Sequence, residues 1–460
     1  MEGRARRSAG QQNRYGAPGR ALPAEKSKCI GRWYHPLFCL GLSFAGNPYR
    51  GGVLLAADLH LHSRYSGAVS PYMTVQNIAR AAQLKGIDLL STADCLQEEW
   101  LGEIRSALEE AEPGILALRP AMAEAVERTL PARVRRRLRF VLGTEVCCAP
   151  PGTPLRGGLH HLLYFPSFDS VERFRLQVAR HGDLHDGRPT LALSSRQLLE
   201  LVLAHDPACR FAPAHVFNPW YASLGAVSGG HSLAEVFDDL APHLVAVETG
   251  LTSTPAMCRR LSSLDHYALF SNSDAHSLVN LGRECTLLDI EPGYEPLFTA
   301  LRSGDARQVR GTLKVPVEFT QYYLNWCGIC QAECEGKTCL RCGRRAVDGA
   351  RDRLEVVADR AAPVWPPHHP PFRELFPLGD LLAGLLKVGR ESGAVTAMQN
   401  RLRESLGDDR FILTEATFEQ IAAAHTPQLS RAIVAQRTAT PRRPPPSGSV
   451  PSNEQLSFEI

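Results

Sequence analysis

Short apolar runs rich in β-branched residues alternate with helical stretches from Val53 to about Thr312. Runs of this length between helical segments favour buried strands, and the alternation is typical of βα units. We therefore predict an α/β fold, and a βα barrel rather than a sandwich. The seven predicted strands are residues 53–57, 87–91, 139–143, 161–165, 211–214, 244–247 and 267–271.

The segments outside this pattern differ from it in composition. Residues 1–52 are rich in Arg, Gly and Pro and lack periodicity, which predicts a disordered leader. Two origins for it stay open: a start assigned upstream of a native start at Val53, or a genuine basic tail. We expect a barrel at residues 53–312, a cysteine module at 313–347, a mainly helical domain at 348–436 and a disordered tail at 437–460.

An insertion interrupts the barrel pattern between Leu101 and Leu138 and is expected to form two helices. It ends in a basic run, which is interpreted either as a solvated face or as a set of phosphate contacts. The run consists of Arg133, Arg135, Arg136, Arg137 and Arg139.

A histidine or a carboxylate stands at one end of every predicted strand. In a parallel barrel the carboxyl ends of the strands meet on one face, so residues far apart in sequence gather there. Chance placement of such residues at seven successive strands is improbable, so the series predicts a metal site. Its members are Asp58, His60, His62, Asp94, Glu145, His160, His161, His215, Glu248, Asp274 and His276.

Mixed imidazole and carboxylate ligands suit Zn, Mn or Fe, with Mg also considered, and we expect two or three divalent ions. Such ions polarise phosphoryl oxygens and supply hydroxide near neutral pH. The predicted ligands are His60, His62, Asp94, Glu145, His161, His215, Asp274 and His276. Of these, we assign direct catalytic roles to His62, Glu145, Asp274 and His276.

Several neighbouring residues need separate assignments. Asp58 and Glu248 are interpreted as carboxylates that orient a ligand. His160 and His161 are adjacent on one strand and point to opposite faces, so only one reaches the site, and His161 is preferred. Arg64 and Ser66 are candidate phosphate-binding residues, with an ordinary loop role as the alternative.

A second cluster consists of two C-x2-C motifs separated by eight residues. Four thiolates at this spacing bind one zinc tetrahedrally and leave no position for substrate, so we predict a structural zinc. Cys334 lies between the motifs and is expected to be a plain reduced thiol. The predicted zinc ligands are Cys327, Cys330, Cys339 and Cys342.

Charge and cysteine content restrict the compartment more than the function. The chain has a formal net charge of +3, which argues neither for nor against nucleic acid. The 13 cysteines do not show the even pattern of a secreted disulfide scaffold, which indicates a reducing cytoplasm. The apolar stretch at residues 29–46 is too short and too interrupted for a membrane span, so no membrane partner is expected.

The motifs at the strand ends resemble those of the endonuclease Q family. The similar segments are DLHLHSRYS at 58–66, GTE at 143–145, HHLLYFP at 160–166, PAHVFNPW at 213–220, ETGL at 248–251, NSDAHS at 272–277 and LGRE at 281–284. The resemblance continues through the cysteine motifs and a helical stretch at about 372–382, and so covers roughly residues 53–436. It implies a PHP-type distorted (β/α)7 barrel followed by a zinc module and a helical domain.

The resemblance also implies an activity. Endonuclease Q is a DNA repair enzyme that cuts the phosphodiester 5′ of deaminated bases, such as uracil, hypoxanthine and xanthine, or of abasic sites. Its implied partners are DNA carrying these lesions and, further, replication or repair factors. One departure concerns Asp94, which is followed by Cys95, Leu96 and Gln97 where family members commonly carry a nearby His-Pro.

Two other functions compete with this one. Other PHP proteins hydrolyse small phosphorylated metabolites, but such a substrate needs neither a zinc module nor a helical appendage. A DNA-binding protein with a decayed site is the third hypothesis, and the complete ligand series argues against it.

Overall fold

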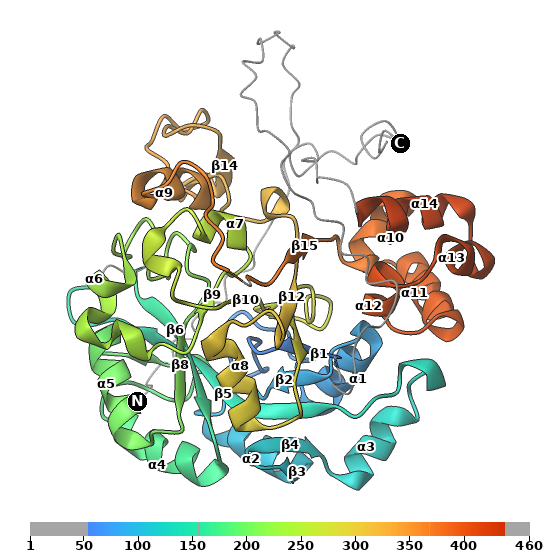
Figure 1. Cartoon of the computed structure of the whole chain (residues 1–460), viewed down its shortest axis with the longest axis horizontal. Helices are drawn as coiled ribbons and strands as arrows, with labels where there is room; N and C mark the ends of the chain where they lie inside the picture. Colours follow the sequence, from blue (N-terminus) through green and yellow to red (C-terminus); the bar gives the residue numbers. More distant parts are fainter. Residues whose placement is uncertain (1–53, 154–156, 368, 438–460) are drawn as a thin grey trace, which may run out of the picture. The chain divides into compact units, whose positions relative to one another are not determined.

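The computed structural model describes residues 54–153, 157–367 and 369–437, which Figure 1 shows in colour. The expectations for the leader at 1–52 and for nearly all of the tail at 437–460 lie outside these residues. Within the described ranges, no helix combines the length and the apolar character needed to cross a bilayer.

The central sheet contains eleven strands, and eight of them are hydrogen-bonded in the order β15-β12-β11-β1-β2-β5-β4-β3. Strands form at all seven predicted positions, although two of them are only two residues long. These seven are β1 (Leu54–Asp58), β2 (Leu89–Ser91), β5 (Arg139–Cys148), β6 (Leu159–Phe165), β8 (Arg210–Pro213), β9 (Val247–Glu248) and β10 (Leu269–Phe270). Of these, β9 and β10 form a separate two-stranded sheet. The other strands of the central sheet are β3 (Leu108–Glu112), β4 (Ile115–Leu118), β7 (Thr190–Leu191), β11 (Cys285–Asp289), β12 (Val309–Lys314) and β15 (Phe372–Glu374).

The predicted parallel arrangement is wrong for part of this sheet. Strands β1, β2 and β5 are parallel, but β6 runs antiparallel to both β5 and β8, and β11 runs antiparallel to β1. The β5–β6 connection is short enough for a hairpin-like return, whereas a parallel pairing needs a crossover of a dozen residues or more. The amino end of β6 therefore lies where its neighbours have their carboxyl ends.

Single hydrogen bonds close the strands into a distorted ring. Val245 N donates to Phe211 O at 2.9 Å, which joins β8 to the start of β9. Strands β9 and β10 are parallel, and Ser271 N just after β10 donates to Thr286 Oγ1 of β11 at 3.0 Å. Since β11 pairs with β1, the path returns to its start. The expected α/β class with a distorted barrel is confirmed.

Helices between the strands begin at side-chain caps that their sequences predict. Thr74 Oγ1 accepts from Asn77 N at the start of the first helix, and Ser194 and Gln197 form a capping box. The first helix ends at Gly86, whose φ of 83° favours glycine. The helices of this part are α1 (Val75–Lys85), α2 (Glu98–Ala107), α3 (Pro120–Glu127), α4 (Phe168–Val178), α5 (Ser195–His205), α6 (Leu233–Phe237), α7 (Pro255–Cys258) and α8 (Tyr294–Ser303).

The insertion at 101–138 contains more than the two predicted helices. Between α2 and α3 it forms a hairpin of β3 and β4, which extends the central sheet beyond β5. Its basic run is engaged within the protein: Arg136 pairs with Asp88 and Asp408, and Arg139 pairs with Glu112. The two interpretations of the basic run, a solvated face or a set of phosphate contacts, therefore do not hold for Arg136 and Arg139.

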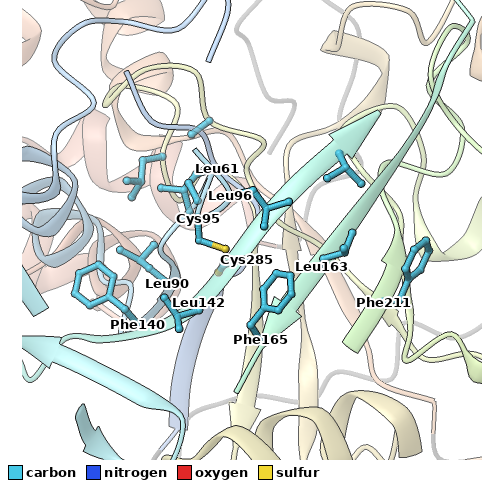
Figure 2. Close-up of a cluster of buried hydrophobic side chains, with 14 of the residues drawn as sticks. Leu61, Leu90, Cys95, Leu96, Phe140, Leu142, Leu163, Phe165, Phe211 and Cys285 are labelled. Carbon is cyan, nitrogen blue, oxygen red and sulfur yellow. The ribbon is translucent and has the colours of Figure 1, made fainter. Parts of the chain in front are cut away.

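Apolar side chains on one surface of the strands form the main core, and alternate residues on the opposite surface, such as Val141 and Leu162, form a second cluster. Figure 2 shows buried residues of successive strands packed together, from Leu90 on β2 through Phe140 and Leu142 on β5 to Leu163 and Phe165 on β6. Each of these side chains is at most 2% exposed. Burying a large aliphatic or aromatic side chain contributes about 1.5–3 kcal/mol, so this layer fixes the strand register on which the polar ends depend.

The chain beyond the barrel forms two further structural groups. Strands β13 (Asn325–Cys327) and β14 (Ala332–Cys334) carry the cysteine motifs, and α9 (Ala350–Val357) follows them, with Ala350 and Leu354 packed in the main core. Residues 372–374, expected to be helical, instead form β15, which pairs with β12. A separate apolar core is built by α10 (Leu378–Leu386), α11 (Gly393–Ser405), α12 (Asp409–Thr414), α13 (Phe418–Ala424) and α14 (Pro427–Gln436).

A fully buried ion pair connects β12 to the loops at the strand ends. Lys314 Nζ donates to Glu284 Oε2 at 2.5 Å, to Gly250 O at 2.8 Å and to Thr249 Oγ1 at 3.1 Å. Both charged side chains are 0% exposed. Burial raises the pKa of Glu284 to about 7 even though Lys314 lowers it. An ion pair so deeply buried is stable only while every donor keeps its acceptor.

We predict that Lys314→Met lowers the free energy of unfolding by about 3–5 kcal/mol, the usual cost of leaving one buried charge without its partner. The variant also raises the pKa of Glu284 further. A carboxyl group whose pKa is higher in the folded than in the unfolded protein stabilises the fold at low pH, and this stabilisation is lost as the pH rises through the folded-state pKa. The variant's loss of stability should therefore grow above pH 7.

Denaturant unfolding at pH 6 and pH 8 measures both effects. Lys314→Met/Glu284→Gln is the matched control, because it removes both charges and should recover part of the stability. Equal stability of Lys314→Met and the unmodified protein at pH 8 would refute the prediction.

Candidate metal centre

The turn after β1 presents two histidines on the same side of the chain. His60 and His62 are two residues apart in extended backbone, so their side chains share a face. The backbone here is held by the loop that follows β10: Leu59 N donates to Asn272 Oδ1 at 2.8 Å, and His62 N donates to Ala275 O at 3.0 Å. Residues more than 200 positions apart are thereby brought together.

His60, His62 and Asp274 form the first group of potential ligands. The Nε2 atoms of the two histidines lie 3.5 and 3.3 Å from Asp274 Oδ1. Ligand atoms about 2.1 Å from a tetrahedral ion are about 3.4 Å apart, so these separations fit one bound metal. Among the described residues, these same three atoms are buried and have no hydrogen-bond partner, which is the donor set a cation requires.

Glu145, His160 and His215 form the second group. Glu145 lies on β5, His160 begins the antiparallel β6, and His215 follows β8. Glu145 Oε1 is 2.9 Å from His160 Nδ1 and 3.0 Å from His215 Nε2. All three residues are buried, so a second cation is held away from bulk water.

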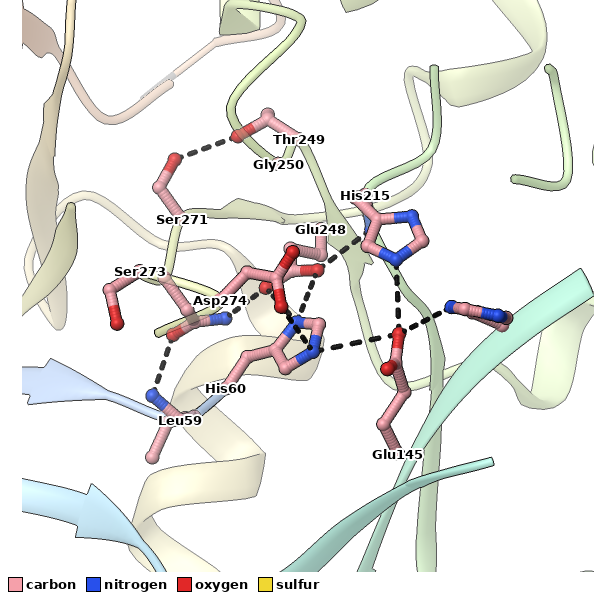
Figure 3. Close-up of polar contacts among 12 residues, drawn as sticks. Leu59, His60, Glu145, His215, Glu248, Thr249, Gly250, Ser271, Ser273 and Asp274 are labelled. Atoms are coloured by element: carbon pink, nitrogen blue, oxygen red, sulfur yellow. Dashed lines mark hydrogen bonds and ion pairs between the residues drawn. The ribbon is translucent and has the colours of Figure 1, made fainter. Parts of the chain in front are cut away.

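Glu145 joins the two groups. Its Oε1 also lies 3.6 Å from His60 Nε2, while its Oε2 lies 3.3 Å from His62 Nε2. Figure 3 shows this carboxylate between His60 on one side and His215 on the other. A carboxylate with one oxygen near each group is the arrangement that bridges two neighbouring metals.

Two further carboxylates orient the first-group histidines from behind. His60 Nδ1 donates to Glu248 at 3.0 Å, and His62 Nδ1 donates to Asp94 Oδ1 at 3.2 Å. A carboxylate only accepts, so each Nδ1 carries the proton and each Nε2 keeps its lone pair for a metal. Asp94 was predicted as a ligand, but its Oδ2 accepts hydrogen bonds from Ser63 and Ser66. The structure therefore places Asp94 behind His62.

The backbone is strained where the ligands project. Asp94, His215 and Asp274 have φ values of 40°, 29° and 46°, in the left-handed region that non-glycine residues rarely adopt. Such strain is retained where surrounding contacts determine the conformation, and it gathers at functional sites. Here Glu248 Oε2 accepts from His215 N at 2.7 Å and so holds that turn.

The electrostatics of the cluster favour a positive occupant. Burial alone would raise the pKa of Glu145, yet His160 and His60 hold that pKa well below its ordinary value. Burial alone would lower the pKa of His60, yet Glu248, Asp274 and Glu145 raise it well above the usual range. Four buried or nearly buried carboxylates contact His60 or His62, and a cation bound between them would compensate their charge.

The preference for His161 over His160 is corrected by the structure. His161 Nε2 lies 2.7 Å from Ser195 Oγ, and its ring packs against Phe211 and Phe237 on the far side of β6. Burial lowers the pKa of His161 to about 3. The alternation along β6 is as expected, but the antiparallel pairing sends the first histidine, and not the second, into the cluster.

The other predicted residues take different positions. The His276 ring lies 4.6 Å from the His62 ring at an angle of 53°, its side chain is 31% exposed, and it stays outside the two groups. Arg64 pairs with Glu103, and Ser66 Oγ donates to Asp94, so the carboxylates of Glu103 and Asp94 are the partners that this structure shows for these two side chains. Asp58 accepts from Ser273 N and Gly282 N at 2.9 Å each, which anchors the Asp274 loop.

Sequence reasoning missed two residues of the site. Asn272 accepts from Leu59 N, and its Nδ2 donates to Glu248 Oε1 at 2.7 Å. Its position within the NSDAHS segment could have identified it from the sequence. Arg188 Nη1 lies 3.3 Å from Glu145 Oε2. Arg188 stands in a loop without periodicity, so nothing in the pattern marked it.

The four cysteines of the two C-x2-C motifs come together as expected. Their sulfur atoms all lie within 4.8 Å of one another, with Cys327 and Cys342 3.6 Å apart. Four thiolates around one zinc at about 2.3 Å are about 3.8 Å apart, which fits this spacing. Cys334 is excluded from the group, and its sulfur lies 3.8 Å from Ala332 O.

We predict that His160→Ala, and not His161→Ala, reduces the metal content by about one ion per chain, because only His160 completes the second three-ligand group. His161→Ala removes a ring packed between two phenylalanines and should lower the melting temperature with metal content unchanged. Elemental analysis together with thermal melting separates the two effects. Metal loss confined to His161→Ala would restore the original assignment.

We also predict that Cys339→Ser removes about one zinc ion per chain, since three thiolates no longer close the shell. The loss should unfold the β13–β14 segment, because binding energy of such a site is folding energy. Cys334→Ser is the matched control and should keep its zinc. Unchanged zinc content in Cys339→Ser would rule out the four-cysteine site.

Comparisons with known proteins agree with the motif resemblance. No family model matches the chain. The Bacillus subtilis protein YqxK is 27% identical over 413 residues, which cover 83% of this chain and 94% of that protein. The lesion-specific endonuclease PfuEndoQ of Pyrococcus furiosus is similar with a TM-score of 0.71 and 28% identity, covering 84% of this chain and 91% of that chain.

A second solved structure, endonuclease Q in complex with a 27-mer duplex carrying an abasic lesion at the active site, gives a TM-score of 0.72 and 28% identity. It covers 84% of this chain and 92% of that chain. The expected enzyme class, a metal-dependent hydrolase of ester bonds, is thereby confirmed, and the chain is similar to endonuclease Q in fold and across most of its length.

Proposed function

We propose that this protein is a DNA repair endonuclease that hydrolyses the phosphodiester 5′ of deaminated bases or abasic sites. The observation that carries the proposal is the Glu145 carboxylate between two groups of ligands. A pair of metal sites that share one carboxylate suits the in-line displacement of a phosphate ester. The likeness to a lesion-specific endonuclease over 84% of the chain supports DNA as the substrate.

The residues around the cluster have distinct roles in this proposal. His60, His62 and Asp274 would hold one metal, and Glu145, His160 and His215 a second. Divalent metals bound there would polarise the phosphate and lower the pKa of a water molecule. Glu248 and Asp94 keep the Nε2 atoms of His60 and His62 aimed at the metal position, so little reorganisation precedes the reaction.

The reaction exchanges one phosphorus–oxygen bond for another. A water oxygen bonds to phosphorus, the bond from phosphorus to the 3′ oxygen breaks, and that oxygen takes up a proton. The products are a 3′-hydroxyl and a 5′-phosphate. His276, which lies beside His62 and is partly exposed, is our candidate for the proton donor.

Selectivity for a lesion requires that the altered base leave the duplex stack. Uracil, hypoxanthine and xanthine each present a carbonyl acceptor where the parent base has an amino donor. Damaged pairs cost less to open, and a pocket built for the carbonyl penalises the normal base by about 1–3 kcal/mol for each buried partner left unpaired. Repair or replication factors are further partners in this proposal. The eleven cysteines of the described residues, four of which form the zinc group, are not joined by disulfides, which is consistent with the proposal of a reducing cytoplasm.

Labelled duplexes with one uracil, one hypoxanthine or one abasic site should be cut once, 5′ of the lesion, to leave an extendable 3′-hydroxyl. Unmodified duplex should be cut at least about tenfold more slowly, the discrimination that about 1.4 kcal/mol gives. Gel analysis and extension by a polymerase measure the position and the ends.

His62→Ala and Asp274→Ala should abolish cutting, because both supply the first metal group. His231→Ala is the matched control, since His231 is exposed and distant in sequence from every ligand. Equal cutting of modified and unmodified duplexes would remove the lesion preference. Brisk hydrolysis of a small phosphate ester without DNA cutting would favour the metabolite phosphoesterase.

A further inference from the structure

Arg188 reaches the metal cluster from a loop that is fixed on both sides. The loop precedes β7, and its Pro189 O accepts from Cys147 N at 2.9 Å. On the other side, Gly187 N donates to Tyr65 O at 3.0 Å. Asp186 accepts from Arg188 N at 2.9 Å and from Gly67 N at 3.2 Å, which ties the loop to the turn beyond His62.

The loop approaches so closely that only glycine fits before Arg188. A Cβ at Gly187 would lie 2.4 Å from both Asp94 Oδ2 and Ser66 Oγ. No real Cβ makes such contacts, so the backbone lies directly against the carboxylate that orients His62. The position of the Arg188 backbone is therefore set by the same contacts that set the metal cluster.

The guanidinium of Arg188 uses only part of its hydrogen-bonding capacity. Nη1 contacts Glu145 Oε2 at 3.3 Å, and the side chain is 28% exposed. Its remaining donors have no other acceptor among the residues that the structure describes. A guanidinium carries five N–H donors in a planar fork that matches phosphate oxygens, so donors remain for a ligand in the open part of the site.

Two other arginines near the cluster have partners other than the side chains of the two ligand groups. Arg64 is paired with Glu103, and Arg283 donates to the backbone carbonyls of Ser273 and Asp274. Within the described part of the chain, Arg188 is the arginine whose guanidinium contacts a side chain of either ligand group. This geometry favours Arg188 for a phosphate contact over Arg64, which the sequence analysis named as a candidate.

Arg188 could either contact the substrate or only neutralise Glu145, and the charges at the site distinguish these two roles. Two divalent metals would be balanced by Asp94, Glu145, Glu248 and Asp274. The charge of Arg188 is then surplus until an anion of one negative charge arrives, and a phosphodiester is such an anion. With metals bound, Glu145 no longer needs a guanidinium for neutralisation.

We propose that Arg188 is a catalytic residue that donates to a non-bridging oxygen of the scissile phosphodiester and stabilises the charge that grows on it in the transition state. This inference rests on the proposed function of the same site. No bond in the reaction changes on its account, because Arg188 neither gives up nor accepts a proton. Its effect is a fixed positive charge that requires no reorganisation when the substrate reacts.

Arg188→Gln and Arg188→Lys test the assignment in the metal-loaded full-length protein. The first measurement is the hydrolysis of bis(p-nitrophenyl) phosphate, a phosphodiester that needs no lesion recognition. Arg188→Gln should lower kcat/KM about 100-fold, as loss of one transition-state donor does, with part of the effect in kcat. Arg188→Lys should recover only part, because an ammonium keeps the charge but loses the planar fork. Arg180→Gln, an exposed arginine just before the same loop, is the matched control.

The second measurement is binding of inorganic phosphate by titration calorimetry, with metal content measured on the same samples. Arg188→Gln should weaken phosphate binding about tenfold, the effect of one charged hydrogen bond, while metal content stays at the level of the unmodified protein. Loss of metal from Arg188→Gln would show that Arg188 only supports Glu145. Phosphate affinity and hydrolysis within about threefold of the unmodified protein would also overturn the proposal, since threefold is under 1 kcal/mol.

The two proposals fail in different ways. If the unmodified protein hydrolyses the model diester but leaves lesion-bearing duplexes intact, the repair function is wrong, and the Arg188 comparison is still decided on the diester. If hydrolysis is absent altogether, phosphate titration decides alone, and equal affinities of Arg188→Gln and the unmodified protein refute the role.

Discussion

The Glu145 carboxylate is the constraint around which the strand ends are arranged. It is buried, and an isolated buried carboxylate costs several kcal/mol unless charges and hydrogen bonds compensate it. Compensation comes from histidines on three different strand ends and from one arginine, and each must keep its place for the others to stay paired. Strained backbone at His215 and Asp274 is tolerated because this arrangement determines it.

Much of the barrel was predictable because its strands are buried and short. Apolar runs located all seven strands, and the histidines and carboxylates at their ends identified the metal cluster. The direction of each strand in the sheet could not be predicted from these runs. A run such as residues 159–165 has the same pattern whether it pairs parallel or antiparallel, so periodicity could not show that His160 enters the cluster while His161 packs against Phe211.

The remaining misses come from contacts that have no local signal. The arginines of the insertion, which the sequence suggested were exposed, pair with Asp88, Asp408 and Glu112. These partners lie far away in sequence or in a hairpin that pattern analysis did not detect. Asp94 looked like a ligand because carboxylates at strand ends often are. Only the positions of Ser63 and Ser66 show that both of its oxygens are occupied behind His62.

The appended parts of the chain are attached through the strand that also supports the catalytic loops. Lys314, the last residue of β12, bonds to Gly250 O just after Glu248 and to Glu284 just after the Asp274 loop. The same strand pairs with β15, which leads directly into the helices of the second core. One buried lysine thus bonds to the loops that carry Glu248 and Asp274 from the same strand that pairs with β15, and this links the start of the appended helices to the site through direct hydrogen bonds.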